Sequence, residues 1–498
     1  MNTLRISRAV EDGEPTSRLH DTSISRRDAL AFGAVAGGTL IAGCLGVTTD
    51  DDASQDPTDD GSAADEDGFP EPRYGDPDRT YHLTATESEV TVAPGKRHDG
   101  WTYDGAYPGP EIRAVEGERV RVVVENELPE GTTIHWHGMV LDGDNAMDGV
   151  PGVTQAPIEP GEEFVYEFDA EPAGTHWYHS HVGLQLDREL LGPLIVEEEE
   201  PHVEYDAEAT LVLDEYLPSE PRVETSSGRR GGGMGGMGGF PDAPPAEGTL
   251  VNGRLPEDPT HVDVEEGDRI RLRLINAAAA DTYAVGIDGH ELLVTHTDGP
   301  AVEPVVVDTL EMGMGERYDV VVEAQSPGRW PIRIVPVDSE TPSGHAVLNY
   351  DGADGGVTEG EIGSHRLELS DLHSIDSIAG VEGTPDRTVD LTLSGGPMGG
   401  DAWTIDGQAY PDADPIVIDE GEHVRFRMRN RSPMRHPMHL HGHHFAVGDA
   451  IKDTVVVPGH MGEVTIDFVA ENPGVWFFHC HHLYHMETGM AREVLYDG

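Results

Sequence analysis

A short sequence segment occurs three times in this chain, at intervals that match the size of a small domain. Residues 116–122, 266–272 and 420–426 each contain an acidic residue, a glycine and then alternating polar and apolar positions. The glycines of the three segments are separated by 150 and 154 residues. A turn glycine followed by alternation with a period of two predicts a strand with one buried face. A repeat at this spacing predicts three copies of one domain.

The rest of the chain predicts the same all-β class. Strand-like segments punctuated by Gly, Pro and Asp recur from about residue 80 onward, and no convincing amphipathic helix interrupts them. This pattern is typical of β-sandwiches. With 498 residues, the chain accommodates three such domains in succession. We expect them at residues 73–200, 201–355 and 356–498.

The charge balance excludes some partners. The chain has 94 acidic against 32 basic residues, which gives a formal net charge of −62. Such a surface repels the phosphates of nucleic acids. It also keeps a protein soluble at high ionic strength, where the self-repulsion is screened. We therefore expect no nucleic-acid partner and a halophilic source organism.

The first 72 residues predict an export signal followed by a tether. Arg26 and Arg27 precede a short run rich in Gly and Ala that ends at Cys44. Residues 1–44 resemble a twin-arginine signal with a lipobox, and the apolar run is too short for a permanent membrane span. Cys44 would then anchor the protein to a membrane by a lipid at the cell surface, or it is an ordinary thiol in the discarded leader of a secreted protein. Residues 45–72 are acidic and poor in large apolar side chains, which predicts a disordered linker.

The stretch around residue 480 has the ligands of a metal site. An aromatic run leads into His479, Cys480 and His481, which predicts a buried strand. On a strand the two imidazoles share one face and the thiol lies on the other. His485 and Met490 follow at intervals of five residues, and Cys, His and Met with one more His suit an electron-transfer copper. The alternative is a core Cys beside satisfied histidines, which leaves the His-x-His pairs elsewhere unexplained.

Three further His-x-His pairs are related by the repeat. It aligns the pairs of the first copy with those of the third: His179 and His181 with His479 and His481, and His135 and His137 with His439 and His441. Ser180 stands where the third copy has Cys480, and the second copy has no His at either place, so we expect it to be a spacer without copper. Eight imidazoles in four pairs can converge only if the first and third domains face each other. His436 lies three residues before His439, so in an extended segment it would face the thiol.

These motifs resemble those of the multicopper oxidases, and most of all the three-domain laccase branch, including laccase-like oxidases of halophilic archaea. The resemblance runs from about residue 75 to the C-terminus, and all four His motifs keep their order and spacing. It implies three consecutive cupredoxin-like Greek-key β-sandwich domains. It also implies four copper ions, one of type 1, one of type 2 and a type 3 pair.

The resemblance assigns a role to each ligand. The type 1 copper would take His436, Cys480 and His485 with Met490 as its axial ligand, the type 2 copper would take His135 and His439, and the type 3 pair would take His137, His179 and His481 on one ion and His181, His441 and His479 on the other. The backbone of His479, Cys480 and His481 would then connect the type 1 copper to the other three.

The reaction implied is the oxidation of phenols or aromatic amines, one electron at a time, coupled to reduction of dioxygen to water. A first alternative is a metal oxidase that acts on Cu(I) or Mn(II) in copper tolerance. A second alternative, from another class, is a copper-binding scaffold with an inactive cluster.

Proton delivery to dioxygen requires a carboxylate close to the histidine cluster. Asp148 stands where laccases place theirs, after the first His pair, although it could also be a turn-former before Gly149. Several bacterial relatives have a Glu directly after the last His ligand, and here that place is Met486. The sequence therefore predicts one proton route and leaves the second open.

Overall fold

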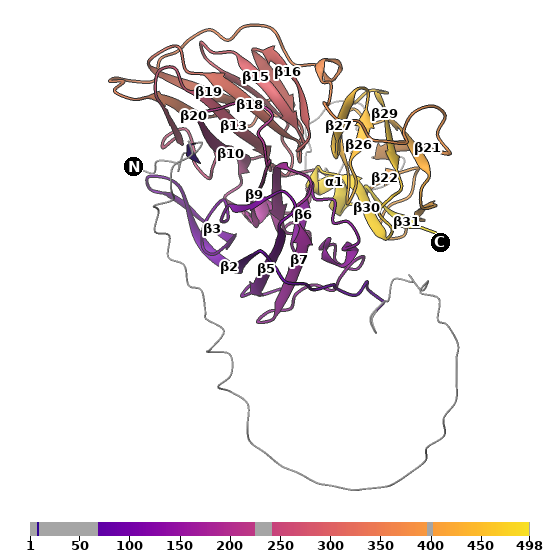
Figure 1. The fold of residues 1–498 in the computed structure, drawn as a ribbon. Coiled ribbons are helices and arrows are strands. Elements are labelled where there is room, and N and C mark those ends of the chain that lie inside the picture. Colours follow the sequence, from indigo (N-terminus) through magenta and orange to yellow (C-terminus); the bar gives the residue numbers. More distant parts are fainter. Residues whose placement is uncertain (1–6, 9–67, 225–241, 396–401, 498) are drawn as a thin grey trace, which may run out of the picture. The chain divides into compact units, whose positions relative to one another are not determined.

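A computed structural model of the chain describes residues 7–8, 68–224, 242–395 and 402–497, and nearly all of its regular elements are β-strands (Figure 1). The described strands form six sheets, which fall into three pairs along the chain. The first pair comprises a sheet of order β3-β2-β5-β7 and a sheet of order β4-β9-β8-β6. Their bounds are β2 (Arg79–Ala93), β3 (Lys96–Tyr103), β4 (Ile112–Val115), β5 (Arg119–Asn126), β6 (His135–His137), β7 (Glu163–Asp169), β8 (Gly174–His179) and β9 (Leu191–Glu197).

The second pair spans the middle of the chain. One sheet has the order β1-β10-β13-β18-β15-β16, with β11 paired to β10, and the other has the order β12-β20-β19-β14-β17. Their bounds are β1 (Ser7–Arg8), β10 (Ala207–Tyr216), β11 (Gly248–Val251), β12 (His261–Val264), β13 (Arg269–Asn276), β14 (Tyr283–Ile287), β15 (Leu292–Thr297), β16 (Ala301–Val307), β17 (Thr309–Met312), β18 (Arg317–Glu323), β19 (Arg329–Pro336) and β20 (Gly344–Tyr350).

The third pair ends the chain. One sheet has the order β22-β21-β24-β29-β26-β27 and the other has the order β23-β31-β30-β25-β28. Their bounds are β21 (Arg387–Gly395), β22 (Trp403–Ile405), β23 (Ile416–Ile418), β24 (His423–Asn430), β25 (His436–Leu440), β26 (Phe445–Val447), β27 (Ala450–Lys452), β28 (Thr454–Val457), β29 (Glu463–Val469), β30 (Val475–Cys480) and β31 (Ala491–Tyr496). The described helices are short: η1 (Asn145–Met147), η2 (Leu186–Arg188), η4 (Leu369–Asp371) and α1 (Leu483–Glu487).

The three repeated segments form equivalent strands. They are β5, β13 and β24, and each pairs in parallel with the first long strand of its own sheet and antiparallel with a later one. Apolar positions alternate along β5 and β24, so one face of each strand is buried and the other faces solvent. The prediction of an all-β chain of three cupredoxin-like β-sandwich domains is confirmed.

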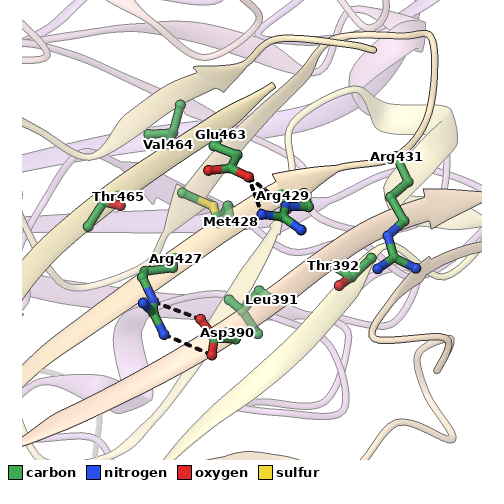
Figure 2. A pocket seen from close by; sticks show the side chains of 10 residues that line it. All are labelled: Asp390, Leu391, Thr392, Arg427, Met428, Arg429, Arg431, Glu463, Val464 and Thr465. Carbon is green, nitrogen blue, oxygen red and sulfur yellow. Dashed lines mark hydrogen bonds and ion pairs between the residues drawn. The ribbon is translucent and has the colours of Figure 1, made fainter. Parts of the chain in front are cut away.

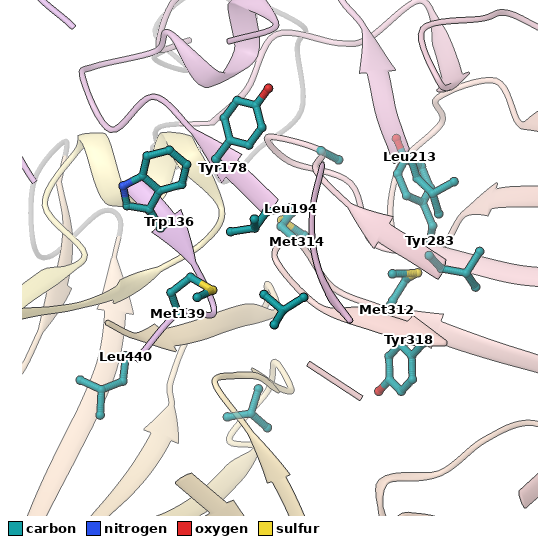
Figure 3. Close-up of a cluster of buried hydrophobic side chains, with 14 of the residues drawn as sticks. Trp136, Met139, Tyr178, Leu194, Leu213, Tyr283, Met312, Met314, Tyr318 and Leu440 are labelled. Carbon is teal, nitrogen blue, oxygen red and sulfur yellow. The ribbon is translucent and has the colours of Figure 1, made fainter. Parts of the chain in front are cut away.

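One apolar core runs through all three pairs of sheets (Figure 3). It includes Trp136 of the first pair, Tyr283 and Met312 of the second and Leu440 of the third, all of them fully buried. Because the core is continuous, the sheets that carry the His pairs are held in fixed relation to one another.

Two segments near the expected domain limits make contacts with a neighbouring domain. Residues 365–375 bridge to β16 and β17 of the second pair, and Leu372 is buried there. This part of the expected third domain therefore packs on the second. Phe69, Pro70 and Pro72, at the end of the expected linker, line a groove with Phe164.

The predicted twin-arginine signal and lipobox lie outside the described residues, apart from β1. No helix among the described residues has the length and apolarity needed to cross a membrane.

Candidate metal centres

Three side chains converge beside the end of β30 to form what we call the cysteine site. The Cys480 Sγ atom lies 3.6 Å from Nδ1 of His436 and 3.6 Å from Nδ1 of His485. The two Nδ1 atoms are 3.1 Å apart. His436 comes from the start of β25, and His485 comes from α1, the short helix that follows β30. The structure thus brings together the three residues predicted for the type 1 copper.

The side chains of the cysteine site are shielded from solvent, and neighbouring side chains fix the two imidazole rings. All three side chains are fully buried, and burial raises the pKa of the Cys480 thiol well above its ordinary value. The ring of Trp403 packs at 4.1 Å from the His485 ring. The Ser432 Oγ atom lies 2.8 Å from Nε2 of His436, which leaves Nδ1 of that ring turned toward the thiol. A cation would stabilise the thiolate that burial disfavours.

The predicted axial residue lies beside this site. Met490 is fully buried, and its carbonyl oxygen accepts a hydrogen bond from the Cys480 N–H at 3.0 Å. Its own N–H donates to the carbonyl of His485 at 2.9 Å. The turn after α1 therefore returns the chain to the thiol, as the spacing of five and five residues predicts.

Eight further imidazoles form a second group, which we call the histidine cluster. On the first pair of sheets, β6 lies against β8 with His135 opposite His179. On the third pair, β25 lies against β30 with His439 opposite His479. The remaining members are His137, His181, His441 and His481, and all eight side chains are buried.

The two halves of the histidine cluster meet across the boundary between the first and third pairs. The rings of His135 and His441 stack at 3.7 Å, and those of His137 and His439 stack at 3.8 Å. The rings of His181 and His479 approach to 5.3 Å, and those of His179 and His481 to 5.4 Å. The predicted convergence of the four His pairs is therefore observed. Strand alternation decides it, because Cys480 faces the cysteine site while its two neighbours face the cluster.

The free nitrogens of the cluster fit metal ions. The Nδ1–H of His479 donates to the carbonyl of Cys480, and His441 Nδ1 lies 3.0 Å from both oxygens of Asp148. Their Nε2 atoms then face each other at 3.0 Å, and with both protons on Nδ1 two lone pairs confront each other there. Buried Nε2 atoms without a protein partner also occur on His135, His179, His181, His439 and His481.

The ionisation of the cluster agrees with this interpretation. Burial lowers the pKa of His137, His179 and His441 well below the ordinary value, and the same holds for His479 and His481. These five imidazoles are therefore neutral near pH 7, and neutral imidazole is the form that binds metals. Buried unpaired acceptors carry a large free-energy cost unless a cation satisfies them.

Sequence profiles of the multicopper oxidase family match residues 84–201, 208–353 and 383–498. The chain belongs to the multicopper oxidase family. It is 35% identical over 430 residues to multicopper oxidase MmcO of Mycobacterium tuberculosis, which covers 79% of this chain and 82% of the relative. It is 28% identical to a copper resistance protein A homolog of Pseudomonas syringae pv. tomato, over 85% of this chain and 94% of the relative.

Solved structures agree with the sequence relatives. The crystal structure of the laccase from Botrytis aclada matches with a TM-score of 0.72 at 27% identity, over 84% of this chain and 87% of the laccase. The multicopper oxidase described here is thus an oxidoreductase, and its family implies copper ions in type 1, type 2 and type 3 sites.

Asp148 joins the two halves of this oxidase's histidine cluster. It ends η1, is fully buried, and its Oδ1 atom lies 3.2 Å from Nδ1 of His135. Its carboxylate is also 3.0 Å from Nδ1 of His441, and its carbonyl accepts a hydrogen bond from His135 at 2.9 Å. The turn interpretation holds as well, because Gly149 follows with a φ of 78°. Asp148 therefore fixes one ring from each half of the cluster.

A second buried carboxylate, Asp453, has no motif around it in the sequence. It lies between β27 and β28, where Arg317 of β18 donates to it at 2.6 and 2.7 Å. Its Oδ1 atom is 3.3 Å from Nε2 of His137 and 3.5 Å from Nδ1 of His439. Burial alone would raise the pKa of Asp453, but the Arg317 guanidinium holds it well below its ordinary value. No sequence signal pointed to it, because Arg317 and His137 are both more than a hundred residues away.

The second domain does more than separate the other two. Arg317 belongs to it, and at Gly315 a Cβ atom would come within 2.9 Å of the His481 ring and 3.0 Å of the His137 ring. As predicted, the strands equivalent to the His-bearing ones, β14 and β19, carry no histidine.

Met486, which directly follows the ligand candidate His485, lies beside four histidines predicted for the type 3 pair. Met486 lines a cavity of about 10 Å³ together with His179, His181, His479 and His481. Glu487 is exposed to solvent. At this place the chain therefore presents a thioether and no carboxylate to the histidines.

Proposed function

We propose that this multicopper oxidase couples the one-electron oxidation of phenols or aromatic amines to the four-electron reduction of dioxygen to water. The observation that carries the proposal is the convergence of eight buried imidazoles from the first and third domains, with the cysteine site on the same strand. A copper-binding scaffold would not need both sites, and the complete set of donors disfavours an inactive cluster.

The proposed ligands are those predicted from the motifs. His436, Cys480 and His485 would hold the type 1 copper with Met490 as its axial ligand, and His135 and His439 would hold the type 2 copper. His137, His179 and His481 would hold one type 3 copper. His181, His441 and His479, whose donor atoms lie within 4.8 Å of one another, would hold the other. Bound copper would supply one-electron acceptance at the cysteine site, and the four copper ions of the two sites together would store the four electrons that one dioxygen needs.

The protein itself would position the two sites, exclude water from the histidine cluster and supply protons. His479 and His481 are each one residue from Cys480, so the two sites share a continuous backbone. Burial of the eight imidazoles excludes bulk water from the cluster. Asp148, which is in contact with His135 and His441, is the carboxylate placed to pass a proton toward the cluster, and we propose this as its catalytic role.

The residues around His485, where we expect the electron donor to approach, support a second candidate function. This candidate is a metal oxidase acting on Cu(I) or Mn(II). The His482 ring stacks on His485 at 3.6 Å with nearly parallel planes, and its Nε2 atom is 3.5 Å from Oδ1 of Asp242. Asp281 and Glu215 lie near this helix and are buried. Carboxylates at the approach to His485 favour cationic over anionic donors, and a relative of this chain bears the name copper resistance protein A homolog.

The deciding experiment compares oxygen uptake with 2,6-dimethoxyphenol and with Cu(I), in molar salt. The proposal expects turnover with the phenol, and turnover with Cu(I) alone would establish the metal oxidase instead.

Copper should approach four ions per chain. Cys480→Ser should remove the blue charge-transfer absorption and the turnover together, with about one copper lost. Ser180→Ala, at the equivalent position of the first domain, should keep the blue colour. A wild-type copper content near one per chain would refute the oxidase.

We also propose that the enzyme is exported by the twin-arginine route, anchored by a lipid at Cys44 or secreted, and that it works at high salt. The motifs of residues 1–44 and the net charge of −62 support this. Mass spectrometry of the mature N-terminus from the source cell would test it. An unmodified Cys44 within an uncleaved chain would contradict it.

A further inference from the structure

A polar groove lies on the outer face of the third domain's six-stranded sheet (Figure 2). Its volume is about 360 Å³, within the usual range for sites that bind small molecules. It is formed by outward side chains of β21, β24 and β29, which are neighbours in the sheet. In the register of these strands, Asp390 is opposite Arg427 and Arg429 is opposite Glu463.

Three arginines line this groove, and one of them has no acidic partner. Arg427 pairs with Asp390 at 2.7 Å, and Arg429 donates to Glu463 at 2.6 Å. The Arg431 side chain is exposed and makes no ion pair or hydrogen bond with any residue that the structure describes (Figure 2). The groove therefore has one more positive than negative group, on a chain whose net charge is −62.

Two of the three arginines occur only in the copy that has the cysteine site, and the third is exposed only there. The repeat aligns Asn126, Asn276 and Asn430 at the ends of β5, β13 and β24. At the position of Arg431 the other copies have Glu127 and Ala277. At the position of Arg429 they have Glu125 and Ile275, and at the position of Arg427 they have Val123 and a buried arginine, Arg273. The fold of the strand does not require arginine there, because the first copy forms the same strand without it.

A short connection leads from the groove to the cysteine site. Arg431 is bonded to Ser432, whose Oγ atom lies 2.8 Å from Nε2 of His436. Nδ1 of the same ring is 3.6 Å from the Cys480 sulfur. The segment is well fixed, since the Arg431 N–H donates to Leu393 at 2.9 Å and the Asn430 side chain donates to Met434 at 2.6 Å. A donor held by the Arg431 guanidinium is thus connected to a proposed copper ligand through the Arg431 side chain, the peptide bond to Ser432 and one hydrogen bond.

We propose that this groove is a second electron-donor site, which binds small aromatic carboxylates through Arg431. The inference rests on the proposed oxidase function. A guanidinium pairs with a carboxylate through two parallel hydrogen bonds, and the groove volume accommodates one aromatic ring. The approach to His485 beside Asp242 is acidic, so we assign anionic donors to the groove, which is connected through Arg431 and Ser432 to His436, the other imidazole of the cysteine site.

The electron balance is that of the oxidase. Each phenolic carboxylate gives one electron and its phenolic proton and becomes a phenoxyl radical. Four donors reduce one dioxygen, the second substrate of the proposed reaction, to two waters, and the carboxylate itself is unchanged.

The test uses the copper-loaded enzyme and two donors that differ by one carboxylate, syringate and 2,6-dimethoxyphenol. Arg431→Glu should raise the KM for syringate about threefold to tenfold, from loss of one ion pair and the added repulsion. Its kcat for syringate and both constants for 2,6-dimethoxyphenol should stay within about twofold. Arg431→Lys should fall between the wild type and Arg431→Glu. Arg97→Glu, an exposed arginine of the first domain, is the matched control and should leave all constants unchanged.

A binding measurement separates this inference from the proposed function. The non-oxidisable analogue 3,4,5-trimethoxybenzoate should bind the wild type more tightly than Arg431→Glu in titration calorimetry, by the same factor as the KM change. Equal binding by the two proteins, or an equal effect of Arg431→Glu on both donors, would overturn the donor site. If the wild type oxidised neither phenol, the proposed function would fail, and an undiminished analogue affinity in Arg431→Glu would still refute the groove.

Discussion

At the scale of single residues, the two buried carboxylates of the histidine cluster differ in how readily they can be found. Asp148 follows the first His pair in a recognisable motif and holds His135 and His441. Asp453 holds His137 and His439, but its charge is balanced by Arg317 from the second domain. A residue whose partners are distant in sequence leaves no local pattern, so only the folded chain identifies it.

The Arg317–Asp453 pair is expected to be a large contributor to stability. Asp453→Asn removes the nearest acidic partner of the fully buried Arg317 and leaves it Asp298 at 3.6 Å, which should cost about 3 kcal/mol because the buried charge is then poorly compensated. Thermal and denaturant unfolding would measure this. Asp390→Asn removes an exposed partner of Arg427 and should cost less than about 1 kcal/mol. If both variants lost the same free energy of unfolding, the buried pair would contribute no more to stability than the exposed one.

At the scale of elements, strand alternation and one turn place the ligands. Alternation along β30 puts the thiol and the two imidazoles on opposite faces, and this was predictable from three letters of sequence. The turn after η1 is different, because Gly149 lies against the carbonyl of Ile134, the residue before β6. That contact sets where Asp148 meets His135, and no sequence rule gives it.

Two glycines of this loop provide a matched test. Gly149 and Gly152 both have a φ of 78°, but a Cβ atom at Gly149 would lie 1.8 Å from the Ile134 oxygen while at Gly152 it would meet nothing within 4 Å. Gly152→Ala should cost about 1 kcal/mol, the strain of a left-handed backbone. Gly149→Ala should cost several times more and reduce the copper content, as measured by unfolding and metal analysis. If the two variants lost similar free energies of unfolding, the Ile134 carbonyl would be able to move away from the added methyl group at little cost.

A strand end at the junction of the first and second domains should give pH-dependent stability. Glu198, directly after β9, accepts a hydrogen bond from Arg271 at 2.7 Å and is 3.1 Å from Nε2 of His296. Asp319 shares Arg271. Burial would raise the pKa of Glu198, but His296 and Arg271 hold it far below its ordinary value. A carboxyl with a depressed pKa stabilises the fold above its unfolded pKa, and this stability is lost as the pH falls from there.

Glu198→Gln should therefore lower the free energy of unfolding by about 1–3 kcal/mol at pH 7. The difference from the wild type should shrink as the pH falls below about 4.3, the unfolded value for Glu. Unfolding curves at a series of pH values would measure it. Glu257→Gln, in an exposed pair with Lys96, is the control and should show almost no difference. A loss that is constant from pH 7 to pH 3 would contradict the linkage.

At the scale of the whole molecule, the net charge of −62 acts on the entire fold. Self-repulsion of this size opposes the compact state, and salt screens it because the Debye length falls to about 3 Å at 1 M. The thermal midpoint should rise by several degrees between low and molar KCl, with most of the gain below about 1 M. Calorimetry at fixed pH measures this. A midpoint that is independent of KCl would remove the argument for a high-salt setting.

The sequence by itself determined the all-β class, the threefold repeat and the metal-binding motifs, because turn glycines, period-two alternation and ligand spacing are local properties. The ligands of the cysteine site could also be predicted from the sequence, because three of the four lie within eleven residues of one another. The tertiary structure decided the rest. Stacking of His135 on His441, the Arg317–Asp453 pair and the packing of residues 365–375 on the second domain all join segments far apart in the chain. Such contacts depend on how whole sheets pack, and packing is a property of the assembled core rather than of any stretch of sequence.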